Sequence, residues 1–117
     1  MKIFKEFTFE AAHKLPFVPL SHKCSNLHGH SFKARICVQG PVNKMGWVMD
    51  FADLKKECGP CIEKLDHAYL NEIPGLENPT SENIAIWIWE NIEKKLCGLL
   101  SVEVQETCNS GCIYDGR

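Results

Sequence analysis

The sequence has no long run of apolar residues, no low-complexity segment and almost no excess of charge. Because no apolar stretch approaches the roughly 20 residues that cross a bilayer, no membrane span is expected. The 13 Lys and Arg against 15 Asp and Glu give a net charge of −2, which argues against an extended nucleic-acid interface. Residues 1–7 interrupt their apolar side chains with charges, unlike a signal peptide. We expect a cytoplasmic protein with neither nucleic acid nor membrane as a partner.

Internal repeats and a Pro- or Gly-rich linker are also missing, so one domain spanning residues 1–117 is expected. Hydrophobic residues make up 44% of the chain, close to the average for soluble domains. A chain of this length can bury a core without disulfide bonds. The seven cysteines are an odd number and no secretion signal accompanies them, which favours reduced thiols over a disulfide framework.

Side-chain periodicity predicts strands at both ends of the chain and two helices between them. The expected elements are a strand over 7–13, a polar loop over 14–26, a strand over 28–38, a helix over 51–65, a loop over 66–79, a helix over 81–97, a strand over 101–107, a turn over 109–111 and a short strand through 113–114. Asp50 and either Thr80 or Ser81 are suitable N-caps. Gly98 ends the second helix, and Pro60 is expected to kink or split the first.

The element order ββααββ predicts an α+β fold, with one antiparallel sheet that carries both helices on a single face. A sheet this small has two open edges, and exposed edges are usually covered or paired. We therefore expect the chain to form a homo-oligomer, with a site made from more than one subunit.

Three histidines are predicted to lie on one face of two neighbouring strands. His13 ends the first strand, and His28 and His30 begin the second with the parity of its apolar residues. Three neutral imidazoles suit zinc, and three ligands leave a coordination position open, as a catalytic zinc requires. The alternative is that His28 and His30 are solvated polar residues at the start of a strand.

Cys24 lies four residues before His28, in the polar loop. Its thiolate could complete a closed structural site with the three histidines, or it could stand beside the metal as a base. The sequence alone leaves both alternatives open. The distinction matters because a closed coordination sphere would remove the open position.

Two carboxylates are candidates for further chemistry. Asp66 precedes His67, and a carboxylate beside an imidazole can fix its tautomer and stabilise its cation, although a solvated helix end fits equally well. Glu106 shares the parity of Val102 and Val104, so its carboxylate points to an apolar face and needs a partner. That partner could be an internal Lys or Arg, or a ligand that presents adjacent N–H donors.

Residues 58–61, Cys-Gly-Pro-Cys, match the motif of thioredoxin-like oxidoreductases. In those proteins the motif follows a strand and opens a helix, whereas here a helical pattern precedes it. A thiol-disulfide oxidoreductase acting through Cys58 and Cys61 is therefore a remote alternative. Cys108 and Cys112 flank a predicted turn and could meet each other or a metal, but core or chance thiols fit them better.

Six motifs carry a resemblance to a known family that extends over essentially the whole chain. They are Phe-Thr-Phe-Glu-Ala-Ala-His (7–13), Cys-Ser-Asn-Leu-His-Gly-His-Ser-Phe (24–32), Val-Met-Asp-Phe-Ala-Asp-Leu-Lys (48–55), Leu-Asp-His (65–67), Pro-Thr-Ser-Glu-Asn (79–83) and Glu-Thr (106–107). In this order and spacing the sequence resembles the 6-pyruvoyltetrahydropterin synthase family. The three residues between Cys24 and His28 resemble the bacterial branch that forms 6-carboxytetrahydropterin for queuosine synthesis.

The resemblance implies the tunnelling fold, in which sheets of several subunits, as a hexamer or tetramer, join into a barrel and pterin binds at a subunit interface. It also implies a zinc-dependent lyase that converts 7,8-dihydroneopterin triphosphate to 6-carboxy-5,6,7,8-tetrahydropterin, triphosphate and acetaldehyde. The implied roles are zinc ligands for His13, His28 and His30, base for Cys24, relay for His67 with Asp66, and pterin binding for Glu106 and Thr107.

Related activities remain alternatives at this point. A synthase that forms the 6-pyruvoyl product or converts sepiapterin would use the same ligands and base, because substrate positioning decides which bond breaks. A noncatalytic protein stabilised by zinc is another alternative.

Overall fold

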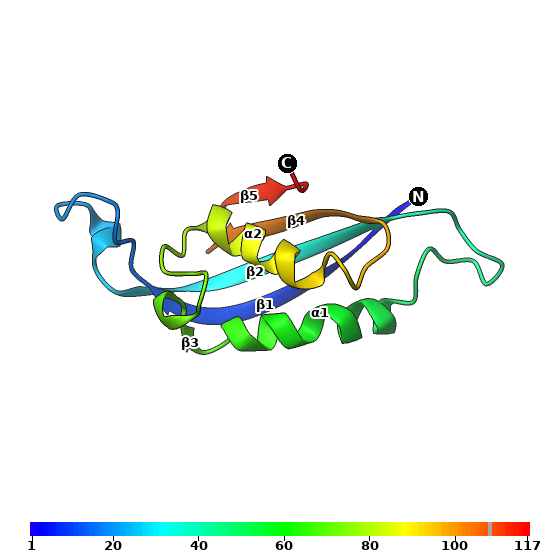
Figure 1. Ribbon diagram of the computed structural model, residues 1–117, viewed down its shortest axis with the longest axis horizontal. Helices are drawn as coiled ribbons and strands as arrows, with labels where there is room; N and C mark the ends of the chain where they lie inside the picture. The colour runs from blue at the N-terminus through cyan, green and yellow to red at the C-terminus, as the bar shows by residue number, and fades with distance from the viewer. Residues whose placement is uncertain (108) are drawn as a thin grey trace.

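A computed structural model describes residues 1–107 and 109–117. The strands and helices are β1 (Lys2–His13), a 3₁₀ turn η1 (Lys23–Ser25), β2 (His28–Gln39), α1 (Phe51–Leu65), β3 (Ala68–Tyr69), a second 3₁₀ turn η2 (Leu70–Glu72), α2 (Ser81–Ile92), β4 (Leu99–Glu106) and β5 (Ser110–Tyr114). They form one five-stranded sheet in the order β3-β1-β2-β4-β5, antiparallel except for the β1–β3 pair (Figure 1). The α+β fold with strands at both ends is confirmed.

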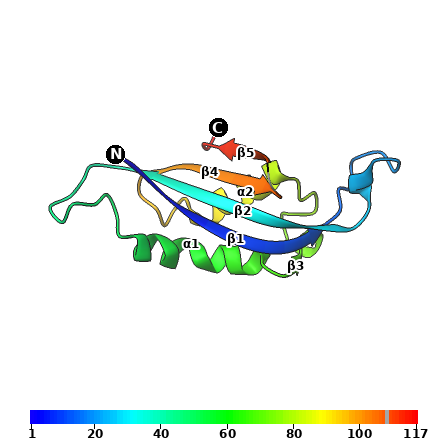
Figure 2. The same cartoon turned by 180° about the vertical axis from the view of Figure 1, so that it is seen from behind.

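Alternation of side chains places one face of the sheet against the helices. In β1 and β2, Phe9 pairs with Phe32 and both are 1% exposed, so this face is core. α2 lies in front of β2 and β4 in Figure 1 and behind them in Figure 2, while α1 runs along β1. Leu54 and Leu65 of α1 and Ile88 of α2 are fully buried in the same apolar cluster. The prediction that both helices cover a single face is confirmed.

The N-cap residues of both helices are as predicted, but α1 is not broken at Pro60 and α2 is shorter than predicted. Asp50 accepts a hydrogen bond from the N–H of Ala52, and Thr80 accepts one from the N–H of Asn83. The predicted break at Pro60 is wrong, since α1 is one continuous helix. Pro60 lies on the exposed side, and packing of the opposite side on β1 holds the helix through it.

Other boundaries also differ from the predictions: β4 begins at Leu99 instead of at residue 101, and β5 begins at Ser110, inside the turn predicted over 109–111. The first strand begins at Lys2, because the alternation of β1 continues with half-buried residues toward the N-terminus. The second helix ends at Ile92 instead of near Cys97, so the prediction that Gly98 ends it is wrong, and turns connect the helix to β4. The region predicted as a loop over 66–79 contains β3 and η2, and β3 pairs in parallel with Ala11 and Ala12 of β1. A two-residue strand is too short to leave a periodic signal.

Both edges of the sheet are open for much of their length in the described part of the chain. β5 is the last strand on one side. On the other side β3 pairs with only two residues of β1 and Asp66 and His67 bond Glu10, which leaves residues 2–9 of the described chain without a paired strand on that edge. Across the described residues, no helix is long and apolar enough to cross a membrane. Open edges of this kind favour pairing with further copies of the chain.

Candidate metal centre and its surroundings

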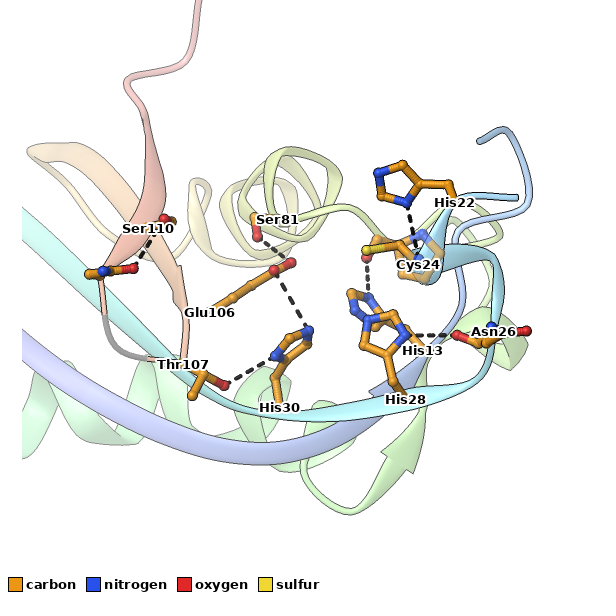
Figure 3. A network of polar contacts seen from close by, with 12 residues as sticks. His13, His22, Cys24, Asn26, His28, His30, Ser81, Glu106, Thr107 and Ser110 are labelled. Atoms are coloured by element: carbon orange, nitrogen blue, oxygen red, sulfur yellow. Dashed lines mark hydrogen bonds and ion pairs between the residues drawn. The ribbon is translucent and has the colours of Figure 1, made fainter. Parts of the chain in front are cut away.

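The two longest strands bring the three histidines together. His13 pairs directly with His28 across the β1–β2 register, and His30 pairs with Ala11 two positions further along, on the same face. The ring centroids lie 4.5 Å apart for His13 and His28, 5.2 Å for His13 and His30, and 4.9 Å for His28 and His30. One nitrogen from each ring falls within 4.8 Å of the other two, so the three residues could hold a metal ion (Figure 3). The predicted convergence of the three rings is confirmed.

Each imidazole is oriented by a hydrogen bond at Nδ1. His13 Nδ1 lies 2.7 Å from the Pro79 carbonyl oxygen, and His28 Nδ1 lies 2.7 Å from that of Asn26. His30 Nδ1 lies 3.1 Å from the Thr107 hydroxyl. Carbonyl oxygens only accept, so His13 and His28 each carry a proton on Nδ1, which makes Nε2 the nitrogen available to a metal. This outer shell is typical of histidines that bind a metal.

His13 gives the strongest sign that a group belongs between the rings. The residue is 1% exposed, and its Nε2 is the one buried side-chain nitrogen or oxygen without a hydrogen-bond partner among the described residues. An unpaired buried polar atom is costly unless a ligand satisfies it. Burial lowers the pKa of the imidazole below its ordinary value, which keeps the ring neutral as metal binding requires.

Cys24 is carried by the single turn η1, in the loop between β1 and β2. This loop runs from after His13 to before His28, so the half-buried Cys24 is tethered between two of the histidines, and Figure 3 draws its side chain above the His13 and His28 rings in that view. The group of mutually close ligand atoms comprises the three histidines without the Cys24 sulfur. This arrangement favours the open site over the closed one.

Glu106 lies on the same face as the histidines, because it pairs with Phe32 at the end of β4. One carboxylate oxygen accepts a hydrogen bond of 2.7 Å from the Ser81 hydroxyl, and the other lies 3.7 Å from His30 Nε2. The side chain is 31% exposed and lines a cavity of about 200 Å³ at the start of α2. Its observed partners are thus a hydroxyl and an imidazole, and the internal Lys or Arg considered above is not among them.

Asp66 and His67 form the predicted pair, but not beside Cys24. Asp66 accepts a hydrogen bond from the N–H of Glu10 and lies 3.0 Å from His67 Nδ1. The Glu10 N–H and the His67 ring hold the pKa of the Asp66 carboxyl below its ordinary value. His67 adopts a left-handed backbone with φ of 58°, and its side chain is 80% exposed. This uncommon conformation holds the imidazole out from the β1 edge.

The cavity beside His67 is lined mostly by residues of the sheet face opposite the imidazole rings, and His30 also borders it. It has a volume of about 660 Å³, and its lining includes Glu10, Ala12 and Ser31, which have the opposite parity from the three histidines. Thr107 also contributes to its wall. Within one chain, therefore, His67 and Cys24 serve different faces of the sheet.

The Cys-Gly-Pro-Cys motif lies in the interior of α1, with both thiols against the core. Burial raises the pKa of Cys58 to about 12 and that of Cys61 to about 11. Because the thiolate is the nucleophile in disulfide exchange, these residues lack the reactive form at neutral pH. Cys112 is half-buried on β5, and burial raises its pKa as well. Cys108 lies outside the described residues, so no pairing with Cys112 is described.

Several polar groups around the histidines had no signal in the sequence. Carbonyl oxygens of Pro79 and Asn26 orient two rings, and every residue type offers such an oxygen. The contact of Ser81 with Glu106 depends on how α2 packs on β4. Thr107, expected to contact pterin, has an observed contact with the His30 ring.

Comparison with known proteins identifies relatives of this chain by sequence and by structure. A family model for 6-pyruvoyl tetrahydropterin synthase matches residues 2–117. The chain is 50% identical to 6-carboxy-5,6,7,8-tetrahydropterin synthase of Synechocystis, over 96% of this chain and 91% of that protein. It is 42% identical to dihydroneopterin monophosphate aldolase of Pyrococcus furiosus, over 83% of this chain and 79% of that protein. The structure of 6-pyruvoyl tetrahydropterin synthase from Caenorhabditis elegans superposes with a TM-score of 0.91 at 28% identity, covering 100% of this chain and 96% of that one.

Proposed function

We propose, from the premise that the chain belongs to the 6-pyruvoyl tetrahydropterin synthase family, that it is the lyase that forms 6-carboxy-5,6,7,8-tetrahydropterin for queuosine synthesis. Its substrate is 7,8-dihydroneopterin triphosphate, which reacts with water to give the carboxylated pterin, acetaldehyde and triphosphate. The observation that carries the proposal is the convergence of three imidazoles, one with a buried and unpaired Nε2, beside a cysteine that is not one of the ligands.

Zinc is the metal that we propose for this centre. The three histidines offer neutral nitrogen ligands, whose number and type match an open catalytic zinc site. When bound, zinc would supply Lewis-acid polarisation of the substrate side-chain hydroxyl groups, which makes their neighbouring protons easier to remove. The Pro79 and Asn26 carbonyls fix the direction in which the His13 and His28 lone pairs point.

We propose that Cys24 removes one of those protons. Its position beside the histidines, outside the ligand group, leaves the sulfur free to act on substrate. A thiol needs help to ionise near neutral pH, and a neighbouring cation lowers its pKa. His67 with Asp66 is the proposed relay for this thiol. Because His67 belongs to the other face of its own chain, the relay has to come from a second subunit.

Sharing of the site between chains has a direct test. We expect Cys24→Ala and His67→Ala each to be nearly inactive, and their mixture to regain activity after dissociation and reassembly. In a mixed oligomer, an intact Cys24 of one chain can meet an intact His67 of another, so about a quarter of the wild-type activity should return if subunits assort at random. The measurement is the rate of acetaldehyde formation before and after mixing. Failure of the mixture to gain activity, with mixed oligomers verified by mass spectrometry, would place both groups in one chain.

Glu106 is the proposed anchor for the pterin ring. Its carboxylate can accept two parallel N–H bonds from the 2-amino group and the adjacent ring nitrogen, as a guanidine-like edge requires. The hydroxyl of Ser81 holds one of its oxygens at the mouth of the cavity. Glu106 would therefore fix the ring while the side chain of the substrate reacts at the metal.

Glu106→Gln is expected to raise KM by about ten- to a hundredfold, because an amide offers only one acceptor and places a donor against a donor. The matched control is Glu103→Gln on the same strand, whose carboxylate has the opposite parity. Steady-state kinetics should show a normal KM for this control. Equal KM values for the two variants would remove Glu106 from substrate binding.

The reaction itself is tested by incubating the purified, zinc-loaded protein with 7,8-dihydroneopterin triphosphate and measuring acetaldehyde. We expect acetaldehyde and the carboxylated pterin in a one-to-one ratio. The monophosphate is the second substrate to test, because the Pyrococcus furiosus relative is named for it. Glycolaldehyde phosphate or a 6-pyruvoyl product in place of acetaldehyde would overturn the proposal.

A further inference from the structure

His22 makes a contact that no step above uses. Its Nδ1 lies 3.0 Å from the backbone N–H of Cys24, and the ring forms the N-cap of η1, the turn that carries the cysteine (Figure 3). An N-cap side chain accepts a hydrogen bond from a backbone N–H that would otherwise lack a partner at the start of a turn. Because Nδ1 is the acceptor here, the His22 ring is neutral with its proton on Nε2.

The turn is fixed at several points besides this cap. The Cys24 carbonyl accepts a hydrogen bond of 2.8 Å from the N–H of Leu15, two residues after His13. At the far end of the turn, Asn26 donates its N–H to Lys23, and its carbonyl oxygen receives the Nδ1 proton of His28. Cys24 is thus held between backbone that follows one predicted metal ligand and backbone that precedes another.

The hydrogen bonds of the turn are of two kinds: most use its backbone groups, and one uses the His22 side chain. The bonds of Leu15 and Asn26 join the turn to the strands, and they involve backbone groups on the turn that any residue type could supply. At the beginning of the turn the Ser25 N–H donates to the His22 carbonyl, and the Cys24 N–H donates to the His22 ring. Only the second of these bonds depends on a side chain, because the Ser25 hydroxyl is directed to the Leu20 carbonyl. The ring of His22 is therefore the part of the network that a substitution can remove without disturbing a metal ligand.

We propose that His22 is a positioning residue for Cys24: its ring caps η1 and holds the thiol at a fixed place beside the metal. The inference rests on the proposed role of Cys24 as base. A base acts only when its atom lies within reach of the proton, so a looser turn lowers the fraction of molecules with Cys24 in place. The expected signature is a loss in kcat with little change in KM, since Glu106 binds the ring elsewhere.

Two substitutions separate this role from a general structural one. His22→Ala removes the acceptor, whereas His22→Asn keeps one, because asparagine is among the best N-cap residues and bonds the N–H two positions ahead. In the full-length, zinc-loaded protein we expect His22→Ala to lower kcat and to speed exchange of the Cys24 amide hydrogen with water, each by about fivefold. His22→Asn should restore both values, and zinc content should stay the same in all three proteins.

The amide exchange rate, followed by NMR, reports the hydrogen bond whether or not the enzyme reaction is the one proposed. Unchanged Cys24 exchange in His22→Ala would overturn the inference, and so would equal kcat losses in the alanine and asparagine variants. If wild type forms no acetaldehyde while exchange responds as expected, the contact stands and the proposed reaction falls. If wild type is active and exchange does not respond, the reaction stands and the positioning role falls.

Discussion

Replacement of Cys24 by alanine is expected to lower the rate of acetaldehyde formation by about three orders of magnitude while one zinc ion stays bound per chain. The size of this loss follows from the roughly 10²- to 10⁴-fold rate enhancement that a positioned general base contributes. Zinc should stay because the three imidazoles come together without the sulfur. Turnover is measured at saturating substrate, and zinc is measured by atomic emission after dialysis.

Cys97 provides a matched control for this variant, because it is an exposed cysteine outside the site. Cys97→Ala should have wild-type activity. Loss of zinc from Cys24→Ala would mean that the thiol is a fourth ligand, and the centre would then be structural. An active Cys24→Ala protein with full zinc would leave the metal site intact and require another base.

His28→Ala is also expected to abolish turnover, but through loss of the metal, which Cys24→Ala retains. Outer-shell partners of metal ligands alone are worth ten- to a hundredfold in affinity, so removal of a ligand should weaken zinc binding by more than about a hundredfold. His28 is half-buried at the start of β2, which makes its truncation easier to tolerate than that of the fully buried His13. Competition with a fluorescent zinc chelator measures the affinity.

Thermal unfolding provides the accompanying readout. Added zinc should raise the Tm of wild type and of Cys24→Ala, because a ligand that binds only the folded state stabilises it by mass action. The Tm of His28→Ala should respond much less. An equal rise in all three proteins would show that the ion binds elsewhere, and the histidine cluster would lose its assigned role.

The histidine cluster could be predicted because it depends on strand parity. Positions 13, 28 and 30 each continue an alternation of apolar residues, and antiparallel pairing then puts the three rings together. Glu106 was found on the same ground, as a carboxylate with the parity of buried valines. Side-chain type and periodicity are both explicit in a sequence, so this part of the site required no tertiary information.

Other features depended on tertiary contacts that leave no local pattern. Continuation of α1 through Pro60 depends on packing against β1, and β3 exists because two residues happen to meet the edge of that strand. His67 follows Asp66 in the sequence, but its own left-handed backbone conformation directs its side chain to the cavity that also contains Glu10 and Ser31. The sequence indicated the Asp66–His67 pair and could not assign it to a face.

One short segment, residues 79–81, contacts both the histidine cluster and Glu106. The Pro79 carbonyl orients the ring of His13, and two residues later the Ser81 hydroxyl holds Glu106. The start of α2 therefore connects the histidine cluster to the proposed pterin anchor, and we expect a small displacement of this backbone to change metal affinity and pterin binding together. Variants in residues 79–81 should accordingly show correlated losses in both properties, even when the altered side chain touches neither ligand.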